Sequence, residues 1–479
     1  MWQNKVSGTI PPEVGTMTKL KYFDFYSNRL TGGIPTTLGQ LTALESLYFG
    51  VNLMTGPLLP ILGQLSSIRY LSLQNNHFTG HYLPELGQLS TMTYIYLNGN
   101  QLTGLIPPEI GQASSLQYLS LYQNQFSGSL PTQISQLTQL HTMFITENIF
   151  SGPLSSELGM LVQLQYLLLY RNRFTGHLIP ELSSLTNLRY MSMYDNMLTG
   201  QISSTLGELT RLEYISFDDN VLSGSLPLEF ELLTLLDYVS FSYNDITGTL
   251  PSFRDLELLE ILILRGNMLT GTIPSHMGQL TVLEELILYS NHFEGPVPIE
   301  LSNCSNMRIL QLQNNFLTGT LDDVFRGDMV VENIDLSNNK FSGDVPQAVF
   351  RLPHIAVVAL SLNCFEGALP ETMCLARNIS VLSMDGLGAA VGCKHSFQVP
   401  LSGVTLFNTL RGSLPECVWS LPLLQVLHLT GNGLTGSIPD DVVIGRALHT
   451  ISLGKCHPHC NVLSYIFIIR VCVTIGSSQ

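Results

Sequence analysis

The residues of this chain with the clearest capacity for recognition chemistry are its tyrosines. Most of the 18 tyrosines stand six, four or two residues before an asparagine that recurs with a period of 24 residues. A tyrosine ring offers a rigid apolar surface with a polar tip, which suits recognition of a protein or a carbohydrate. The alternative is structural, because tyrosine favours strands and stacks along a ladder of strands. The column six residues before the asparagine fits this structural role, whereas the column two residues before it is the better candidate for ligand contacts.

The candidate ligand-contact residues fall into two groups along the chain. The first group is aromatic and acidic, and the second contains an apolar patch that could receive a partner or be ordinary exposed hydrophobic surface. The first group is Tyr122, Phe144, Leu168, Tyr170, Tyr194, Asp195, Asp218 and Asp219, and the second is Ile261, Ile263, Ile287 and Tyr289.

Residue patterns for catalysis and metal binding are absent or incomplete. Gly386, Gly388 and Gly392 are spaced somewhat like a dinucleotide-binding loop, but no helix pattern follows them. The glycine-rich loop, His-Arg-Asp and Asp-Phe-Gly motifs of protein kinases do not occur. The segment Cys456-His457-Pro458-His459-Cys460 has zinc-binding residue types, but four tetrahedral ligands within five residues are sterically implausible. We therefore expect no enzyme activity, no cofactor and no metal site.

The recurring asparagine indicates which elements position the tyrosines. It runs from Asn4 to Asn363 in steps of 24 residues, except for one step of 23 residues between Asn244 and Asn267. The residues five and three before each asparagine are apolar, so those six, four and two before it point outward on a strand. A fixed period of this kind marks a solenoid, in which each unit buries its apolar face by stacking on its neighbours.

The finer repeat pattern resembles a known family. Most units read Asn-x-Leu-Thr/Ser-Gly-x-Ile/Leu-Pro, as in residues 100–107, and continue with Leu-Gly-x-Leu. This is similar to the plant-specific leucine-rich repeat of receptor-like kinases, receptor-like proteins and secreted inhibitors of pectin-degrading enzymes. The resemblance covers residues 4–453 and implies an α/β solenoid with a concave parallel β-sheet and a convex side of short 3-10 helices and loops. It is less specific about function, because one scaffold carries many ligands.

The series of recurring asparagines, which forms an asparagine ladder, also predicts the organisation of the chain. We expect one solenoid domain over residues 1–453, with about 20 units, a start inside a repeat and an irregular unit near 385–400. Leu387 takes the place of the asparagine there, and Cys374 and Cys393, which bracket this unit, could pair in an oxidising compartment. Residues 454–479 form an aberrant apolar tail that is too short, and too interrupted by Arg470, for a membrane span.

These observations lead to an expected function. A formal charge of −15 argues against nucleic acid or an anionic membrane as the main partner. We expect a non-enzymatic, extracellular or cell-surface recognition module whose concave face binds a protein, peptide or carbohydrate, with a co-receptor as a second candidate partner and no membrane insertion by the solenoid. Glycosylation sequons at Asn303 and Asn378 support a secreted location slightly. The alternatives are a secreted inhibitor of a cell-wall-degrading enzyme and an intracellular structural scaffold.

Overall fold

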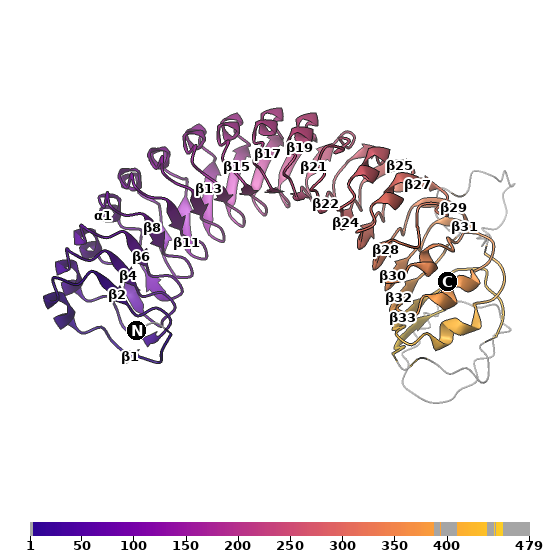
Figure 1. Cartoon of the computed structure of the whole chain (residues 1–479), viewed down its shortest axis with the longest axis horizontal. Helices are drawn as coiled ribbons and strands as arrows, with labels where there is room; N and C mark the ends of the chain where they lie inside the picture. The colour runs from indigo at the N-terminus through magenta and orange to yellow at the C-terminus, as the bar shows by residue number, and fades with distance from the viewer. Residues whose placement is uncertain (1–2, 388–392, 394–409, 438–444, 446, 454–479) are drawn as a thin grey trace, which may run out of the picture. The chain divides into compact units, whose positions relative to one another are not determined.

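The structure, a computed structural model, describes residues 3–387, 393, 410–437, 445 and 447–453. Its contacts divide the chain into two compact units, Met1–Asp245 and Ile246–Gln479. Each unit is a stack of similar coils in which short parallel strands alternate with short 3-10 helices (Figure 1). The predicted α/β solenoid is therefore confirmed. The extent predicted for a single domain, residues 1–453, stays a prediction.

In the first unit, the main sheet lines the inner side of the coils, and each strand pairs in parallel with the strand of the next coil. Its strands are β2 (Tyr22–Asp24), β4 (Ser46–Tyr48), β6 (Tyr70–Ser72), β8 (Tyr94–Tyr96), β10 (Tyr118–Ser120), β12 (Thr142–Phe144), β14 (Tyr166–Leu168), β16 (Tyr190–Ser192), β18 (Tyr214–Ser216) and β20 (Tyr238–Ser240).

A second set of strands follows the turn after each inner strand. These lateral strands are β1 (Ser7–Gly8), β3 (Arg29–Leu30), β5 (Thr55–Pro57), β7 (His77–Thr79), β9 (Thr103–Gly104), β11 (Gln125–Gly128), β13 (Ile149–Pro153), β15 (Arg173–His177), β17 (Met197–Gln201) and β19 (Val221–Ser225), while β21 (Asp245–Thr247) spans the boundary between the units.

Short helices form the outer side of the first unit (Figure 1). All but one are 3-10 helices, and they are η1 (Pro12–Thr16), η2 (Thr36–Gln40), η3 (Pro60–Gln64), α1 (Pro84–Gly87), η4 (Pro108–Gln112), η5 (Thr132–Gln136), η6 (Ser156–Met160), η7 (Pro180–Ser184), η8 (Ser204–Glu208) and η9 (Leu228–Leu232).

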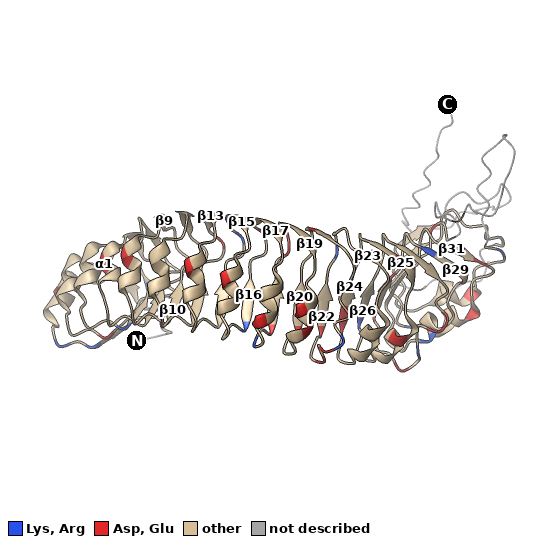
Figure 2. Ribbon diagram, turned by 90° about the horizontal axis from the view of Figure 1, so that it is seen from above, with Lys and Arg blue, Asp and Glu red and all other residues tan. Residues whose placement is uncertain are grey.

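The second unit repeats this plan. Its inner strands are β22 (Ile261–Ile263), β24 (Glu285–Ile287), β26 (Ile309–Gln311), β28 (Asn333–Asp335), β30 (Val357–Ala359), β32 (Val381–Ser383), β33 (Val426–His428) and β34 (Thr450–Ser452). Its lateral strands are β23 (Thr270–Gly271), β25 (His292–Pro296), β27 (Phe316–Gly319), β29 (Lys340–Asp344) and β31 (Cys364–Glu366). Its 3-10 helices are η10 (Ser275–Gln279), η11 (Ile299–Asn303), η12 (Val349–Arg351), η13 (Glu371–Leu375) and η15 (Glu416–Ser420). Charged residues are sparse along the ribbons of both units (Figure 2).

The ladder asparagines join each coil to its neighbours. The Asn148 side chain is 7% exposed, and its amide nitrogen donates to the carbonyl oxygens of Ile145 at 3.2 Å, Thr146 at 3.0 Å and Leu121, in the preceding coil, at 3.0 Å. Its amide oxygen accepts from the backbone nitrogen of Phe126 at 2.9 Å. Because a buried polar group without partners costs free energy, this saturation explains why asparagine recurs at the turn.

Aromatic packing holds the interior of the first unit. Phe126, Phe150 and Phe174 are buried and stack face to face, with ring centroids 6.1 Å and 6.2 Å apart. Each of these rings follows a ladder asparagine by two residues. The repeat thus aligns like side chains in neighbouring coils, which is how a solenoid builds a continuous core.

The irregular unit is an insertion into an otherwise intact ladder. The other paired inner strands of the second unit are 24 residues apart, as for Val357 and Val381, but Val381 of β32 pairs with Val426 of β33, 45 residues later. The backbone oxygen of Leu387 accepts from Phe365 N at 2.9 Å, in place of the missing asparagine oxygen. Leu387 N in turn donates to the amide oxygen of Asn432 at 2.9 Å. Backbone groups therefore bridge the missing asparagine.

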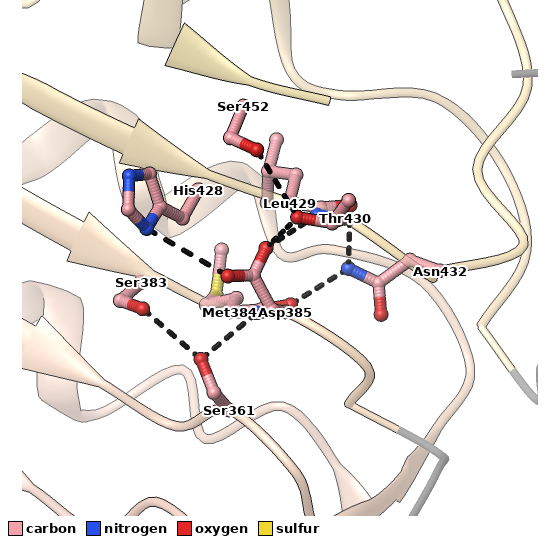
Figure 3. Close-up of polar contacts among 9 residues, drawn as sticks. All are labelled: Ser361, Ser383, Met384, Asp385, His428, Leu429, Thr430, Asn432 and Ser452. Atoms are coloured by element: carbon pink, nitrogen blue, oxygen red, sulfur yellow. Dashed lines mark hydrogen bonds and ion pairs between the residues drawn. The ribbon is translucent and has the colours of Figure 1, made fainter. Parts of the chain in front are cut away.

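A polar cluster reinforces the same junction (Figure 3). The carboxylate of Asp385 accepts hydrogen bonds from the backbone nitrogen and the hydroxyl of Thr430, and it lies 3.7 Å from His428 Nδ1. Asp385 N donates to Ser361 Oγ at 2.9 Å, and Ser361 is hydrogen-bonded to Ser383 at 3.0 Å. The cluster ties β32 to β33 across the insertion.

Two disulfides flank the insertion, and they correct the pairing considered from the sequence. Cys393 pairs with Cys364, and Cys374 pairs with Cys417, each with Cα atoms 5.5 Å apart. The pairing of Cys374 with Cys393 is therefore wrong. Register decides the outcome: Cys364 opens lateral strand β31, while Cys374 and Cys417 lie in the 3-10 helices η13 and η15, which contact each other. Cys304 is buried and unpaired.

Several features singled out in the sequence lie outside the described residues. They are Gly388 and Gly392 of the glycine-rich stretch, most of the irregular segment, the Cys456–Cys460 cluster and the apolar tail 454–479.

Candidate functional site

The aromatic candidates of the first unit share one face of the inner sheet. Tyr170 and Tyr194 are half-buried, and each lies two residues after an inner strand, β14 or β16. Their rings stack with centroids 4.4 Å apart. Burial raises the pKa of Tyr194. Tyr122 lies two coils before Tyr170, and the small side chain of Thr146 stands at the same position between them. The face thus carries a stacked tyrosine pair and a third tyrosine separated from it by a gap.

A charged row borders this tyrosine pair. Arg171 contacts Glu147 through Nη1 at 3.2 Å, and its guanidinium carbon lies 5.7 Å from the ring centroid of Tyr194. Gln123 Nε2 donates to the same glutamate at 3.0 Å. Asp195 and Asp219 follow in this row and are exposed. An approaching ligand would therefore meet charges of both signs at the edge and aromatic rings on the floor.

Phe144 and Leu168 lie deeper on the same sheet. Phe144 makes edge-to-face contacts with Tyr118 and Tyr166, with centroids 5.6 Å and 6.4 Å apart. Leu168, at the end of the next inner strand, is half-buried. Both side chains contribute apolar floor between the tyrosine columns.

Asp218 differs from the other acidic candidates because its carboxylate is already engaged. Its oxygens accept from the Ser216 hydroxyl at 2.7 Å, from the Ser242 backbone nitrogen at 2.6 Å, and from the Ser240 hydroxyl. These donors come from its own coil and the next one. Asp218 therefore has a structural role, because its carboxylate joins two neighbouring coils. The sequence did not reveal this role.

The candidates of the second unit form a mixed patch at its beginning. Ile261 and Ile263 are half-buried, whereas Ile287 is only 7% exposed and therefore belongs largely to the packed interior. The hydroxyl of Tyr289 accepts from Arg265 Nη1 at 3.0 Å, and the guanidinium carbon lies 5.6 Å from the same ring centroid. The exposed apolar patch is thus smaller than its sequence suggested.

The structure also contains a pocket that sequence reasoning missed. It encloses about 420 Å³ on the inner face near the start of the first unit. Its lining residues are Asp24, Tyr26, Tyr48, Tyr70, Ser72, Gln74 and Tyr96. The four tyrosines belong to the outward columns, but no pattern in the sequence marks them as neighbours of one cavity. The nearest signal is Gly50, the one glycine among the outward-pointing positions of these coils, because it leaves room for the Gln74 side chain that lines the pocket.

The column six residues before the asparagine stacks along the inner face. Tyr70 and Tyr94 are stacked at 4.6 Å, and Tyr166, Tyr190 and Tyr214 continue the pattern at 5.0 Å and 5.8 Å. Burial raises the pKa values of Tyr190 and Tyr214. The structural role expected for this column agrees with these contacts, which provide cross-strand stabilisation.

The described part of the chain lacks both a metal-binding cluster and a membrane-spanning helix. Within it, no three His, Cys, Asp or Glu side chains lie close enough together to hold a metal ion. Across those same residues, no helix reaches the length and apolar character that crossing a bilayer requires.

Comparison with known proteins places this architecture. The family model described as a leucine-rich repeat region matches residues 54–201, and the leucine-rich repeat model matches residues 19–41, 258–280, 331–352 and 423–443. No curated protein sequence gives a match.

Solved structures give closer parallels. The structure of a TDR receptor has a TM-score of 0.78 at 29% identity, covering 94% of this chain and 83% of its own. The ectodomain of the Arabidopsis receptor kinase HAESA, in complex with an extended IDA peptide hormone, has a TM-score of 0.81 at 25% identity, covering 95% and 75%. A further structure of HAESA with the hormone and the co-receptor SERK1 has a TM-score of 0.75 at 25% identity, covering 94% and 78%. The predicted plant-type repeat is thereby confirmed.

Proposed function

Because this chain is a leucine-rich repeat protein of the plant receptor type, we propose that it is a non-enzymatic recognition module for a peptide. The peptide lies in an extended form along the inner face of the first unit, over the floor that Tyr122, Tyr170 and Tyr194 share. Similar structures support this choice, since HAESA is a peptide-hormone receptor.

The observation that carries the proposal is the half-exposed aromatic floor. Tyrosines at the outward positions of successive inner strands are partly buried by one another and still reach the surface. Rigid aromatic side chains that lose little entropy on binding are the usual anchors of protein and peptide interfaces. Because the strands already hold these rings, binding needs little reorganisation of the protein.

An extracellular location is part of the proposal. The disulfides Cys364–Cys393 and Cys374–Cys417 favour an oxidising compartment, where such bonds persist. This observation weighs against the intracellular scaffold. A co-receptor is a candidate second partner, because the complex of HAESA contains one.

Retention of peptides from a synthetic random library on the immobilised full chain tests the proposal. We expect the double substitution Tyr170→Ser and Tyr194→Ser to weaken binding of the retained peptides by about 30-fold or more, since even one aromatic anchor at an interface centre contributes about 2 kcal/mol. The matched control is Met197→Ser with Val221→Ser, which removes two exposed side chains from lateral strands β17 and β19 and leaves the inner face intact.

Equal loss in both double variants, or no peptide retained by the native chain, contradicts the proposal. The inhibitor alternative has a separate outcome. In that case the chain lowers the activity of a pectin-degrading enzyme on mixing, and the Tyr170→Ser and Tyr194→Ser variant does not.

A further inference from the structure

We propose that the pocket lined by Asp24, Tyr26, Tyr48, Tyr70 and Tyr96 accepts the cationic head of a lysine or arginine side chain. This inference rests on the proposed function, because the side chain would belong to a peptide that lies along the same inner face. It adds a specificity element: one basic residue in the ligand, placed over the first coils of the unit.

The walls of the pocket are aromatic. Tyr48 and Tyr70 tilt towards each other with centroids 6.3 Å apart, and Tyr70 is stacked in turn on Tyr94 at 4.6 Å. Burial raises the pKa values of Tyr48 and Tyr96, so these phenols are neutral at physiological pH. Neutral aromatic faces attract a cation through the negative potential of their π-systems, and several faces around one point form a cage.

One carboxylate, that of Asp24, gives the pocket a negative charge. Asp24 is the only charged residue among the lining residues, and its Oδ1 accepts from Tyr26 N at 2.9 Å. Among the outward positions two and four residues before each ladder asparagine, residues 24–242 carry only two charges, Asp24 and Asp218. Asp218 is saturated by serine donors of its own and the next coil. The charge complementarity of this face is therefore towards a cation, and it is centred on the pocket.

A glycine next to the pocket leaves room for one of the lining side chains, Gln74. Gly50 stands between Tyr26 and Gln74 in the column two residues before the asparagine. A Cβ added at Gly50 would lie 2.7 Å from Gln74 side-chain atoms, so the glutamine occupies the space that glycine leaves. The pocket volume of about 420 Å³ lies within the range of ligand pockets, about 300–1,000 Å³.

The polar groups of the pocket favour a cation over a neutral sugar. Ser72 is buried and donates to Gln74 Oε1 at 2.7 Å, so these two groups partly satisfy each other. A sugar needs several donors and acceptors in fixed positions, because each buried hydroxyl without a partner costs free energy. A lysine ammonium needs one carboxylate and aromatic faces, and both are present.

Saturation-transfer NMR on the full chain, with aromatic protons irradiated, tests this inference with three small probes. They are Nα-acetyl-lysine methylamide, its neutral counterpart Nα-acetyl-norleucine methylamide, and cellobiose. We expect saturation of the ε-methylene protons of the lysine probe and weaker binding of the other two. Asp24→Asn, which keeps an acceptor for Tyr26 N, should weaken the lysine probe about tenfold.

Matched variants separate the pocket from general electrostatics. Glu13→Gln removes the same charge from an exposed position of this unit, on the outer helix η1, and should leave the dissociation constant of the lysine probe unchanged. Tyr48→Phe keeps an aromatic face and should retain the lysine probe, whereas Tyr48→Leu should weaken it. Circular dichroism of each variant confirms that the fold is intact.

Several results would overturn the inference. They are no binding of the lysine probe, equally tight binding of the norleucine probe, an equal loss in Glu13→Gln, and cellobiose as the preferred probe. Failure of the proposed function is distinguishable. If library peptides bind without enrichment of lysine or arginine and Asp24→Asn has no effect, peptide recognition stands and the pocket assignment falls. If the lysine probe binds through Asp24 but no library peptide is retained, the pocket assignment stands and peptide recognition falls.

Discussion

At the scale of single residues, the turn after each inner strand is set by the ladder position. With the exception of Phe253, every described non-glycine residue with positive φ stands directly before a ladder asparagine. Residues as different as Arg171 (φ 53°), Tyr243 (φ 51°) and Val51 (φ 57°) adopt this left-handed conformation. Asparagine and glycine tolerate it, whereas a β-branched side chain is strained there. The asparagine network therefore holds the preceding residue in the left-handed conformation even where its side chain disfavours that conformation.

The substitution Val51→Asn should stabilise the first unit. Asparagine relieves the left-handed strain at this corner, and the gain expected is about 1 kcal/mol. Asn75, one coil later, already occupies the equivalent position with φ 52°. The midpoint of urea unfolding, followed by circular dichroism, measures the effect.

Gly99→Ala, at the equivalent position one coil further on, is the control with the opposite sign. Its φ is 64°, and an added Cβ would collide with the amide oxygen of Asn75. We expect a lower midpoint for this variant. A lower midpoint for Val51→Asn as well would show that the left-handed corner is not strained by valine.

At the scale of elements, the paired inner strands place their tyrosines side by side in stacked columns. Tyr118 illustrates the consequence: it lies 4.7 Å from Tyr96 and meets Phe144 edge to face, so its ring is partly withdrawn from water. Burial, reinforced by the neighbouring phenols Tyr96 and Tyr122, raises the pKa of Tyr118 to about 12. Packing of the column is thus linked to the protonation of its hydroxyls.

This link predicts a loss of stability at alkaline pH. A phenol whose folded pKa exceeds the unfolded value of about 10 contributes stability that is fully present below pH 10 and is lost as pH rises towards 12. We expect Tyr118→Phe to lose less free energy of unfolding than the native chain between pH 8 and pH 11. After allowance for solvent screening of a half-exposed ring, the difference is about 0.5–1 kcal/mol.

Urea unfolding at the two pH values measures this difference. Tyr22→Phe is the matched control, because Tyr22 occupies the same column at the first inner strand and its side chain is 64% exposed. An identical pH dependence for native chain and Tyr118→Phe would rule out the link.

Sequence periodicity predicts strands, helices and outward columns well, because each coil obeys the same spacing. It fails where the outcome depends on a particular neighbour in the next coil. Ile287 is at an outward position and yet is buried, and Asp218 is exposed by pattern but is bound by serines. The pocket at Asp24 is lined by side chains from four neighbouring coils, and the pairing of Cys374 depends on the register across an insertion. These are relations between coils, which a repeat consensus does not encode.

At the scale of the whole molecule, covalent cross-links are confined, among the described residues, to the second unit. The disulfides close loops with sequence separations of 29 and 43 residues around the insertion. Closing loops of this length removes entropy from the unfolded chain worth about 3–4 kcal/mol for each bond, and the two contributions overlap because the loops interlock.

The double substitution Cys374→Ser and Cys417→Ser should therefore destabilise the second unit by about 3 kcal/mol or more. Hydrogen exchange should become faster in β32 and β33 and stay unchanged in β2 to β8 of the first unit. Cys304→Ala, which alters an unpaired cysteine, should change exchange much less. Faster exchange of equal size in both units would contradict this local role.

The junction between β32 and β33 has a practical consequence for protein engineering. Strand pairing, the reach of the Asn432 amide back to Met384 O at 2.7 Å and the Asp385 cluster all survive an excursion of 45 residues where 24 is the norm. A coil of this scaffold can thus host a guest segment without loss of alignment in the coils on either side. Epitopes or binding loops grafted at that point would be displayed from a framework that keeps its strand pairing around an insertion of this length.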